Sequence, residues 1–481
     1  MKNILFYSIL VFSLFFSGLK AQTSIEHGHD CFSVLAGKNA TAGGSVMFAH
    51  NEDDWGERLV NFYQVPAVTR QKSEMIVMET GAKLLQPEQT WGYLWLEMPE
   101  MEFSDSYMNQ WGVTIASDAC ASREDNGELT DGGIGYWLRR AMAERARTAR
   151  EAVKIGGTLV EQFGYASSGR TYCIADPNEA WMMSVVNGKH WVAQRVPDDQ
   201  VAIIPNYYTI TTVELEDTVN YYGAKDLVTY AIKRRWYIPE AGDFNFRQAY
   251  SNQDNLKNMG NIVRHWSAIN QLSEKQFTIN DEFPFSFKPK QKVALSMLFK
   301  VLRNHNEGSE YDKSEGYVKG HPHEDWSICS PTTQYGFVAQ LRSEMPVEVG
   351  AVLWLAPFRP CVHPFTPWYL GMTGIPDGFA GANYNTALLT HFDKIRDINE
   401  VVPGHRFLEY VRYAKEADID YLFQIETIAK KIKLLEDELI QGQGVFESKC
   451  IEQYSTDPKQ AQKSLTGYSF KQIQRSMEMM K

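Results

Sequence analysis

Several features that would assign a function quickly are missing from this chain. After the N-terminal segment no apolar run approaches the length needed to cross a bilayer, and the sequence contains no internal repeat or low-complexity tract. The formal net charge is −11, which argues against a nucleic-acid-binding surface. Composition therefore indicates a globular protein whose partners are neither nucleic acids nor a membrane core.

Metal-binding motifs and paired cysteines are also scarce. No CxxC or HExxH spacing occurs, so we expect no metal and no cofactor. His321 to Asp325 (HPHED) is the one segment that resembles a set of metal ligands, and it is better explained as a polar loop. There are six cysteines. If the first of them, Cys31, is chemically active, an odd number remains, which excludes a fully paired disulfide framework.

The N-terminal segment has the pattern of a secretory signal. Lys2 precedes the apolar run Ile4 to Phe16, and small residues follow up to Ala21. We therefore expect a signal peptide at residues 1–21, export to the periplasm or the extracellular space, and a short propeptide at residues 22–30. Removal of both segments would make Cys31 the first residue of the mature chain.

The stretch from Cys31 to Trp55 organises the remaining sequence. A cysteine opens one strand, a small-residue turn follows, and the apolar strand Val46 to Ala49 runs into the polar cluster His50 to Asp54. An antiparallel hairpin would bring this polar cluster close to the thiol. We interpret Cys31 as a nucleophile with its polar support; the alternative is a structural or disulfide-bonded cysteine.

An N-terminal cysteine would carry its own base. The α-amine has a reference pKa of about 7.7–8.0 and the thiol about 8.5, so the amine can accept a proton near neutral pH. The same thiol could first attack the bond between Asp30 and Cys31, so that the chain activates itself.

Several segments together resemble one enzyme family. They are the turn and strand after Cys31 (with the pattern GK-A-T--GS and then AHNED), the helix-like segment Leu138 to Ala152, Ile174 to Trp181, and Ser327 to Cys329. The pattern is similar to the cysteine dipeptidases of the N-terminal nucleophile hydrolases, the dipeptidase A and secernin family, which are distant relatives of penicillin V acylases and bile salt hydrolases. The resemblance covers the chain from Cys31 to about Met372. It implies an α+β fold of four layers, αββα, with two antiparallel sheets between helices.

The resemblance also implies roles for individual residues around the thiol. Asp53 matches the carboxylate that binds the nucleophile's α-amine, and Asn206 matches the amide that donates to the oxyanion; the alternative for Asn206 is a plain turn residue. Arg264 matches an arginine that reaches the nucleophile and could favour the thiolate, or it is an exposed salt-bridging residue.

Two further residues are candidates for contact with substrate. His50 stands where these hydrolases commonly have arginine, so it either supplies a titratable cation or is a strand-end histidine bonded to Glu52 or a neighbour. Asp118 ends a predicted strand and could hold the free amine of a substrate; the alternative is an aspartate that caps the next loop.

The rest of the pattern predicts elements that frame this site. Gly135 to Phe163 is the clearest helical stretch, which we expect Gly156 and Gly157 to break, and an antiparallel meander follows with a hairpin at Asn187-Gly188. We expect a catalytic domain at residues 31–420 and a helical extension at 421–481. The extension's amphipathic helix could pack on the domain or on another subunit of a homo-oligomer.

The function predicted from these observations is that of an exported cysteine dipeptidase that acts on small peptides. Two other classes stay open. An amide hydrolase acting on N-acyl small molecules would use the same residues, and a non-enzymatic exported binding protein would keep residues 22–30 and place Cys31 in a disulfide.

Overall fold

The computed structural model describes residues 31–54, 58–314, 319–322, 326–394 and 404–481. The predicted signal peptide and propeptide lie outside the described residues, as do residues 323–325 of the HPHED segment. Within the described helices, none is both long and apolar enough to cross a membrane.

The first sheet holds the hairpin that begins at Cys31. The strands β1 and β2 pair antiparallel with Phe32 opposite Asn51 and Ala36 opposite Met47, which confirms the predicted hairpin. Among the described residues this sheet has seven strands, in the order β16 (Ser286–Phe287), β14 (Val201–Ile204), β1 (Phe32–Ala36), β2 (Val46–Asp53), β17 (Thr333–Leu341), β18 (Ala351–Pro357) and β19 (Thr366–Tyr369). Both central strands of the hairpin are buried along their whole length.

The second sheet contains the predicted meander. Asn187 and Gly188 are the last residues of β12, directly before the turn to β13, and Gly188 has a φ of 86°, which residues with a side chain rarely adopt. Its eight described strands run in the order β15 (Tyr221–Gly223), β13 (Trp191–Val196), β12 (Ala180–Gly188), β11 (Tyr165–Ala175), β10 (Thr114–Ala119), β9 (Ser106–Asn109), β8 (Tyr93–Glu97) and β3 (Asn61–Val65). The segment between β3 and β8 forms two separate two-stranded ribbons, β4 (Val68–Thr69) with β7 (Gln89–Thr90) and β5 (Glu74–Val77) with β6 (Lys83–Gln86).

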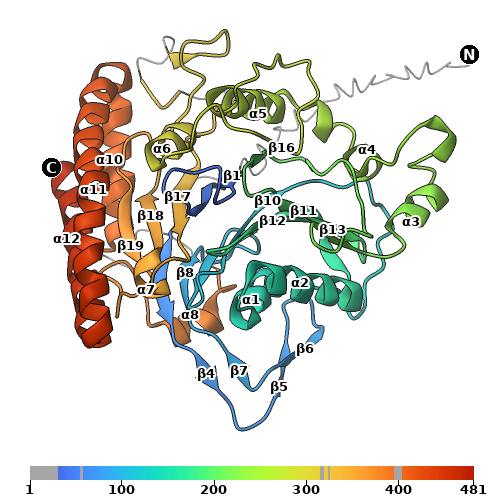
Figure 1. The fold of residues 1–481 in the computed structure, drawn as a ribbon, viewed down its shortest axis with the longest axis horizontal. Helices are drawn as coiled ribbons and strands as arrows, with labels where there is room; N and C mark the ends of the chain where they lie inside the picture. Colours follow the sequence, from blue (N-terminus) through green and yellow to red (C-terminus); the bar gives the residue numbers. More distant parts are fainter. Residues whose placement is uncertain (1–30, 55–57, 315–318, 323–325, 395–403) are drawn as a thin grey trace, which may run out of the picture.

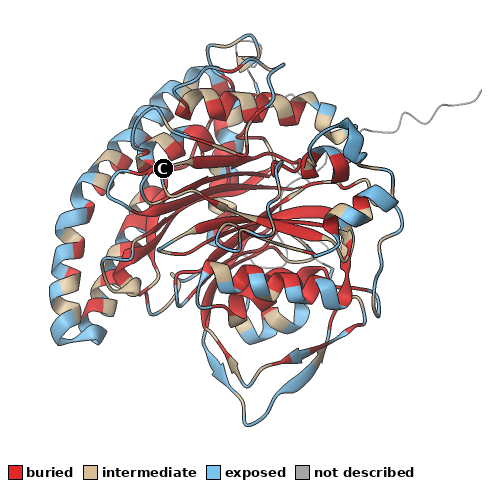
Figure 2. Cartoon of the chain, turned by 45° about the vertical axis from the view of Figure 1, so that its right-hand side comes forward, coloured by how far each residue is buried: buried red, intermediate tan, exposed pale blue. Residues whose placement is uncertain are grey.

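The two sheets pack face to face between layers of helix. Figure 1 shows α1 (Tyr136–Arg145) and α2 (Ala149–Phe163) below the second sheet, and α5 (Met259–Leu272) and α6 (Leu295–Leu302) above the first. The strands and the covering helix faces are mostly buried, while the outer helix faces are exposed (Figure 2). This is the predicted α+β, four-layer αββα arrangement, and the fold class is confirmed.

The remaining helices lie at the margins of the sandwich. The C-terminal helices cover the β17–β19 end of the first sheet, where α12 packs on β19 and buried residues such as Ile432 and Leu465 join the main hydrophobic core. The further described helices are α3 (Leu227–Lys233), α4 (Phe246–Tyr250), α7 (Val347–Gly350), α8 (Tyr384–Thr390), α10 (Arg406–Ile419), α11 (Tyr421–Thr456) and α12 (Pro458–Met479), with 3-10 turns at Pro239–Ala241 and Asn255–Lys257.

The prediction that Gly156 and Gly157 break the helix is wrong. Helix α2 is capped by the Thr148 side chain, which accepts from the Glu151 amide, and it continues through both glycines to Phe163. A Cβ at position 157 would lie 2.0 Å from the ring of Trp191 on β13. The glycines therefore allow the helix to approach the sheet closely, a packing role that a local reading of breaker residues does not reveal.

Candidate active site

Cys31 lies directly before β1 and faces the polar end of β2. Its Sγ is 3.2 Å from Oε1 of Glu52 and 3.5 Å from the carbonyl oxygen of Asp53, and the residue is buried. The hairpin thus brings the thiol to the carboxylate cluster, as the sequence predicts. All six cysteines, each in the described part of the chain, are free thiols, so the structure contains no disulfide at Cys31.

A chain of hydrogen bonds leads from the thiol across the space between the sheets. The Cys31 thiol donates to Oε1 of Glu52, Oε2 of Glu52 lies 3.0 Å from Nε2 of His50, and Nδ1 of His50 lies 2.8 Å from Oγ of Ser33. Ser33 then donates to Oδ2 of Asp118 on β10, at 2.8 Å. These five residues, which we call the thiol relay, connect the first sheet to the second.

For a neutral His50, the hydrogen bonds of the relay allow one arrangement of protons. Because the single hydroxyl proton of Ser33 goes to Asp118, Ser33 must accept from Nδ1–H of His50. A neutral His50 then accepts at Nε2, so Glu52 must carry the proton between them. Burial lowers the pKa of His50 to about 4 and raises the pKa of Glu52, which agrees with a neutral imidazole and a protonated Glu52.

The same environment keeps the thiol protonated. Burial, followed by the neighbouring carboxyl groups of Glu52, Asp118 and Asp53, raises the pKa of Cys31 well above its ordinary value. Burial also raises the pKa of Asp118 to about 6, so this carboxyl is largely ionised near pH 7. A thiolate at Cys31 therefore needs a proton acceptor and a compensating cation.

Asn206 and Arg264 form a second group beside Cys31. Asn206 follows β14, and its Oδ1 accepts from Nη2 of Arg264 at 2.9 Å, while Nη1 of Arg264 donates to the carbonyl oxygen of Cys31 at 3.3 Å. Arg264 lies on α5 and is fully buried, which rules out the exposed alternative for this residue. Nδ2 of Asn206 is buried and has no hydrogen-bond partner among the described residues. An oriented, unused donor is the group that a developing oxyanion requires.

Asp53 is held from the opposite face of β2. Its Oδ1 accepts from Oγ1 of Thr333 at 2.7 Å and from Oγ of Ser330. The register between β2 and β17 shifts by one residue at this point, between Thr333 and Tyr335, so two residues of β17 face this end of β2. This irregularity brings hydroxyl donors to the carboxylate that the resemblance assigns to the α-amine of Cys31.

The structure places the two predicted substrate contacts inside the relay. His50 is bonded to Glu52, the neighbour named in the alternative for this residue. Asp118 accepts from Ser33 and from Sγ of Cys173, at 3.7 Å for the latter, and is fully buried between the sheets. Asp118 thus bonds side chains within the core, where the sequence suggested a loop cap or a ligand for substrate.

Sequence reasoning missed several members of the site. Cys31 and Ser33 share one strand face, as do His50 and Glu52, so the two-residue alternation of a strand could have grouped them. Two buried arginines, Arg139 and Arg170, carry no such signal. Both donate to Oγ of Ser117, Arg170 at 3.2 Å, and their charges counter the burial effect on the pKa of Glu52.

The described residues contain one group of side chains that could hold a metal ion, and it lies outside the thiol relay. It consists of His305, His321, Cys329 and Cys361, all buried. His321 belongs to the segment expected to be a polar loop, and the other three residues carry no recognisable spacing.

The fold is a sandwich of two antiparallel sheets, and the candidate nucleophile is a cysteine at the start of a central strand. The chain belongs to peptidase family C69, whose family model matches residues 30–416. It is similar to a probable dipeptidase of Salmonella dublin, with 26% identity over 71% of this chain and 81% of the relative. It is also similar to a probable dipeptidase of Latilactobacillus sakei, with 25% identity over 86% and 88%.

Solved structures give a more distant comparison. A variant of the conjugated bile acid hydrolase from Clostridium perfringens shares 11% identity, covering 68% of this chain and 89% of the hydrolase, with a TM-score of 0.27. A score this low adds nothing to the fold, which the two sheets and their helix layers define directly.

Proposed function

We propose that this protein is an exported cysteine dipeptidase whose nucleophile is Cys31, freed as an N-terminal residue by self-cleavage. Membership in peptidase family C69 and the dipeptidase names of its relatives support the reaction class. The observation that carries the assignment to Cys31 is the position of Arg264, which bonds both Cys31 and Oδ1 of Asn206, while Nδ2 of Asn206 has no hydrogen-bond partner among the described residues.

The relay supplies a base before the α-amine exists. In the unprocessed chain the Cys31 nitrogen is part of a peptide bond, so it cannot accept a proton. The thiol proton moves to Oε1 of Glu52 while the proton on Oε2 moves to Nε2 of His50, which leaves a thiolate, a neutral Glu52 and an imidazolium. The charge of Asp118 favours that imidazolium.

Self-cleavage then proceeds by acyl transfer. The Cys31 thiolate attacks the carbonyl carbon of Asp30, the peptide bond breaks, and the released nitrogen takes the proton that the His50 imidazolium returns through Glu52, so that it becomes the α-amine. Water hydrolyses the resulting thioester to give the Asp30 carboxylate and the free thiol. In the proposed mature enzyme, Asp53 holds the new amine in place near the sulfur.

Dipeptide hydrolysis uses the same groups in sequence. The α-amine takes the thiol proton, the thiolate attacks the substrate carbonyl, and Nδ2 of Asn206 donates to the oxyanion. The amine then protonates the leaving amino group, and water releases the acyl group from Cys31. Because Asp118 is fully buried and bonded to Ser33, its proposed role is to act through the relay.

Intact mass spectrometry and a substrate panel test this proposal. The protein, expressed with its own N-terminal segment and recovered from the exported fraction, should begin at Cys31 and hydrolyse free dipeptides faster than N-acylated ones. A Cys31→Ala variant should retain residues 22–30. An active wild-type protein that begins near Gln22 would exclude the N-terminal nucleophile, and a preference for N-acylated substrates would exclude the dipeptidase assignment.

A further inference from the structure

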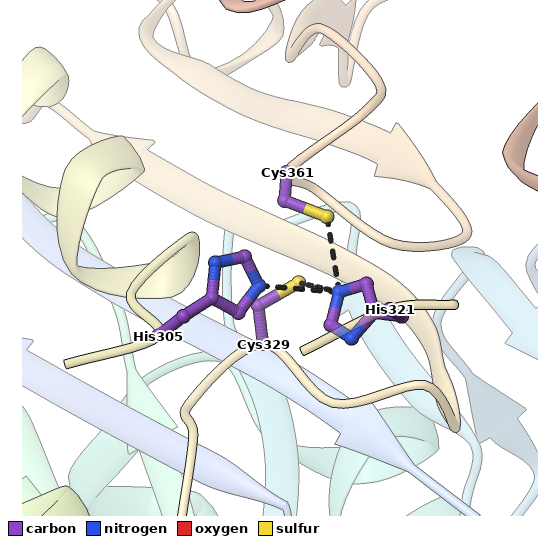
Figure 3. Close-up of side chains that lie close together, drawn as sticks. All are labelled: His305, His321, Cys329 and Cys361. Atoms are coloured by element: carbon purple, nitrogen blue, oxygen red, sulfur yellow. Dashed lines mark hydrogen bonds between the residues drawn. The ribbon is translucent and has the colours of Figure 1, made fainter. Parts of the chain in front are cut away.

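Four side chains meet in a buried cluster behind the active-site strand β2. Nε2 of His321 lies 3.1 Å from Nε2 of His305, 3.2 Å from Sγ of Cys361 and 3.8 Å from Sγ of Cys329. All four ligand atoms lie within 4.8 Å of one another (Figure 3). Two imidazole nitrogens and two sulfurs thus point toward one small volume.

These separations fit a tetrahedral metal centre. Zinc binds histidine nitrogen at about 2.0–2.1 Å and cysteine sulfur at about 2.3 Å, so tetrahedral ligand atoms lie roughly 3.3–3.8 Å apart. A set of two sulfurs and two nitrogens favours zinc over magnesium or calcium, which prefer oxygen ligands. Four protein ligands also leave no open position, which is typical of a structural rather than a catalytic zinc.

The surroundings support metal binding further. Nδ1 of His305 lies 3.1 Å from Oε1 of Glu307, so a carboxylate orients this imidazole with Nε2 toward the cluster. A cavity of about 710 Å³ is lined by Asn304, Glu307 and Cys361 among other residues, and it offers an entry path for an ion.

The ligands come from segments that need a cross-link. His305, His321 and Cys329 belong to the connection between α6 and β17, whose described parts contain no α-helix or β-strand. Cys361 lies in the turn after β18. A metal ion would tie this long connection to the first sheet.

The same connection holds the outer face of β2. The carbonyl oxygen of Ile328 accepts from Nδ2 of Asn51 at 2.9 Å, and Ser330 donates to Asp53. Cys329 lies between these two contacts in the chain, so whatever fixes Cys329 also fixes the support of Asp53.

We propose that His305, His321, Cys329 and Cys361 bind one structural zinc ion that fixes the connection between α6 and β17 behind Asp53. Binding of Zn²⁺ releases the two thiol protons to solvent, because the thiolates are the ligands. This inference is independent of the activity proposed for Cys31, since it concerns ligands outside the thiol relay.

Metal analysis of the purified full-length protein tests the proposal. We expect one zinc ion per chain, and chelator-treated protein should take up one equivalent of Zn²⁺ again in competition with a chromogenic chelator. Cobalt substitution should give the intense visible absorption of a tetrahedral site and a thiolate-to-cobalt charge-transfer band. Protein that neither contains zinc nor takes it up would overturn the proposal.

Matched variants separate this site from the other thiols. Cys361→Ser and Cys329→Ser should each lose the bound zinc and the charge-transfer band, whereas Cys450→Ser, which removes a buried thiol from α11, should keep both. Glu307→Gln should retain the fold and bind zinc about 10- to 100-fold more weakly, because it loosens the orientation of His305. Glu307→Gln with unchanged affinity would contradict the assigned carboxylate contact.

A disulfide between Cys329 and Cys361 is the competing arrangement. Peptide mapping without reduction distinguishes the two arrangements, because a disulfide links the two cysteine-containing peptides and removes two hydrogens from the intact mass. Finding that link in freshly purified, active protein would overturn the zinc proposal.

Discussion

The two faces of strand β2 support the candidate site in different ways. On the face toward the second sheet, His50 and Glu52 exchange hydrogen bonds with Cys31 and Ser33, all of them groups that can move a proton. On the opposite face, Asn51 and Asp53 are held by backbone carbonyls and hydroxyl groups. In the proposed mechanism one face of β2 therefore transfers protons and the other positions Asp53, and each face can be altered alone.

Removing the thiol should have the largest effect, since both proposed uses of the site require it. Cys31→Ala should lose self-cleavage and dipeptidase activity entirely, with turnover at the uncatalysed background. Cys31→Ser keeps a hydroxyl in place of the sulfur and serves as the matched control for packing. Intact mass and dipeptide hydrolysis measure the two losses, and residual turnover by Cys31→Ala would assign the nucleophile elsewhere.

Replacing one carboxyl on each face of β2 by an amide should separate self-cleavage from dipeptide turnover. Glu52→Gln should slow self-cleavage by about 10²- to 10⁴-fold, the usual contribution of a general base, because an amide cannot relay the thiol proton. The Asp53→Asn variant should cleave itself at a rate closer to that of wild type but should lose dipeptide turnover, because it no longer holds the α-amine of Cys31. Time courses of precursor mass and of dipeptide hydrolysis provide the comparison. Equal loss of both steps in both variants would show that the faces do not act separately.

Removing the oxyanion donor should affect chemistry more than binding. Asn206→Ala should lower kcat by about 10²- to 10³-fold and change KM little, because its Nδ2 has no partner among the described residues and is proposed to bond only the developing oxyanion. Steady-state kinetics on a free dipeptide measure both constants. A raised KM with an unchanged kcat would instead indicate a contact with bound substrate.

Asp118, the last residue of the thiol relay, should affect how the free energy of unfolding depends on pH. Asp118 has its pKa raised from 3.8 to about 6, so the folded state keeps a proton that the unfolded state loses between these values. The contribution of Asp118 is therefore most favourable below about pH 4 and is lost as pH rises to about 6. Asp118→Asn should gain up to about 3 kcal/mol relative to wild type between pH 4 and pH 7. Urea unfolding at several pH values measures this difference.

Two serines, one bonded to a residue on each face of β2, should give the smallest effects. Ser33→Ala removes the link between His50 and Asp118, and Ser330→Ala removes a donor to Asp53. Hydrogen bonds to charged groups contribute about 1.5–3 kcal/mol, so each variant should slow its own step by roughly 10- to 100-fold. Ser33→Ala should act mainly on processing and Ser330→Ala mainly on turnover. Reversal of that order would exchange the roles assigned to the two faces.

The sequence was most informative where chain neighbours determine the geometry. The hairpin from Cys31 to Asp53 was predictable because antiparallel pairing places the end of one strand beside the start of the other. Asn206 and Arg264 were named from the resemblance, and the structure brings both beside Cys31. Their catalytic roles stay predictions.

Contacts between distant layers could not be read from the chain. Asp118 meets Ser33 only because the two sheets pack face to face, and position 157 of helix α2 needs a glycine because the ring of Trp191 on β13 lies against it. The cluster that includes His305 and Cys361 joins segments with no ligand spacing. In each case the constraint is tertiary, so local propensity and periodicity carry no trace of it.

The bond from Ser33 to Asp118 has a consequence for the timing of activation. Because its two ends belong to different sheets, the proposed route for the thiol proton is complete only after the sandwich has closed. A newly synthesised or misfolded chain then carries a dormant sulfhydryl, and peptidase activity arises only in molecules that have reached their final shape. Completion of the fold would thus activate the enzyme, and no separate activating protease would be needed.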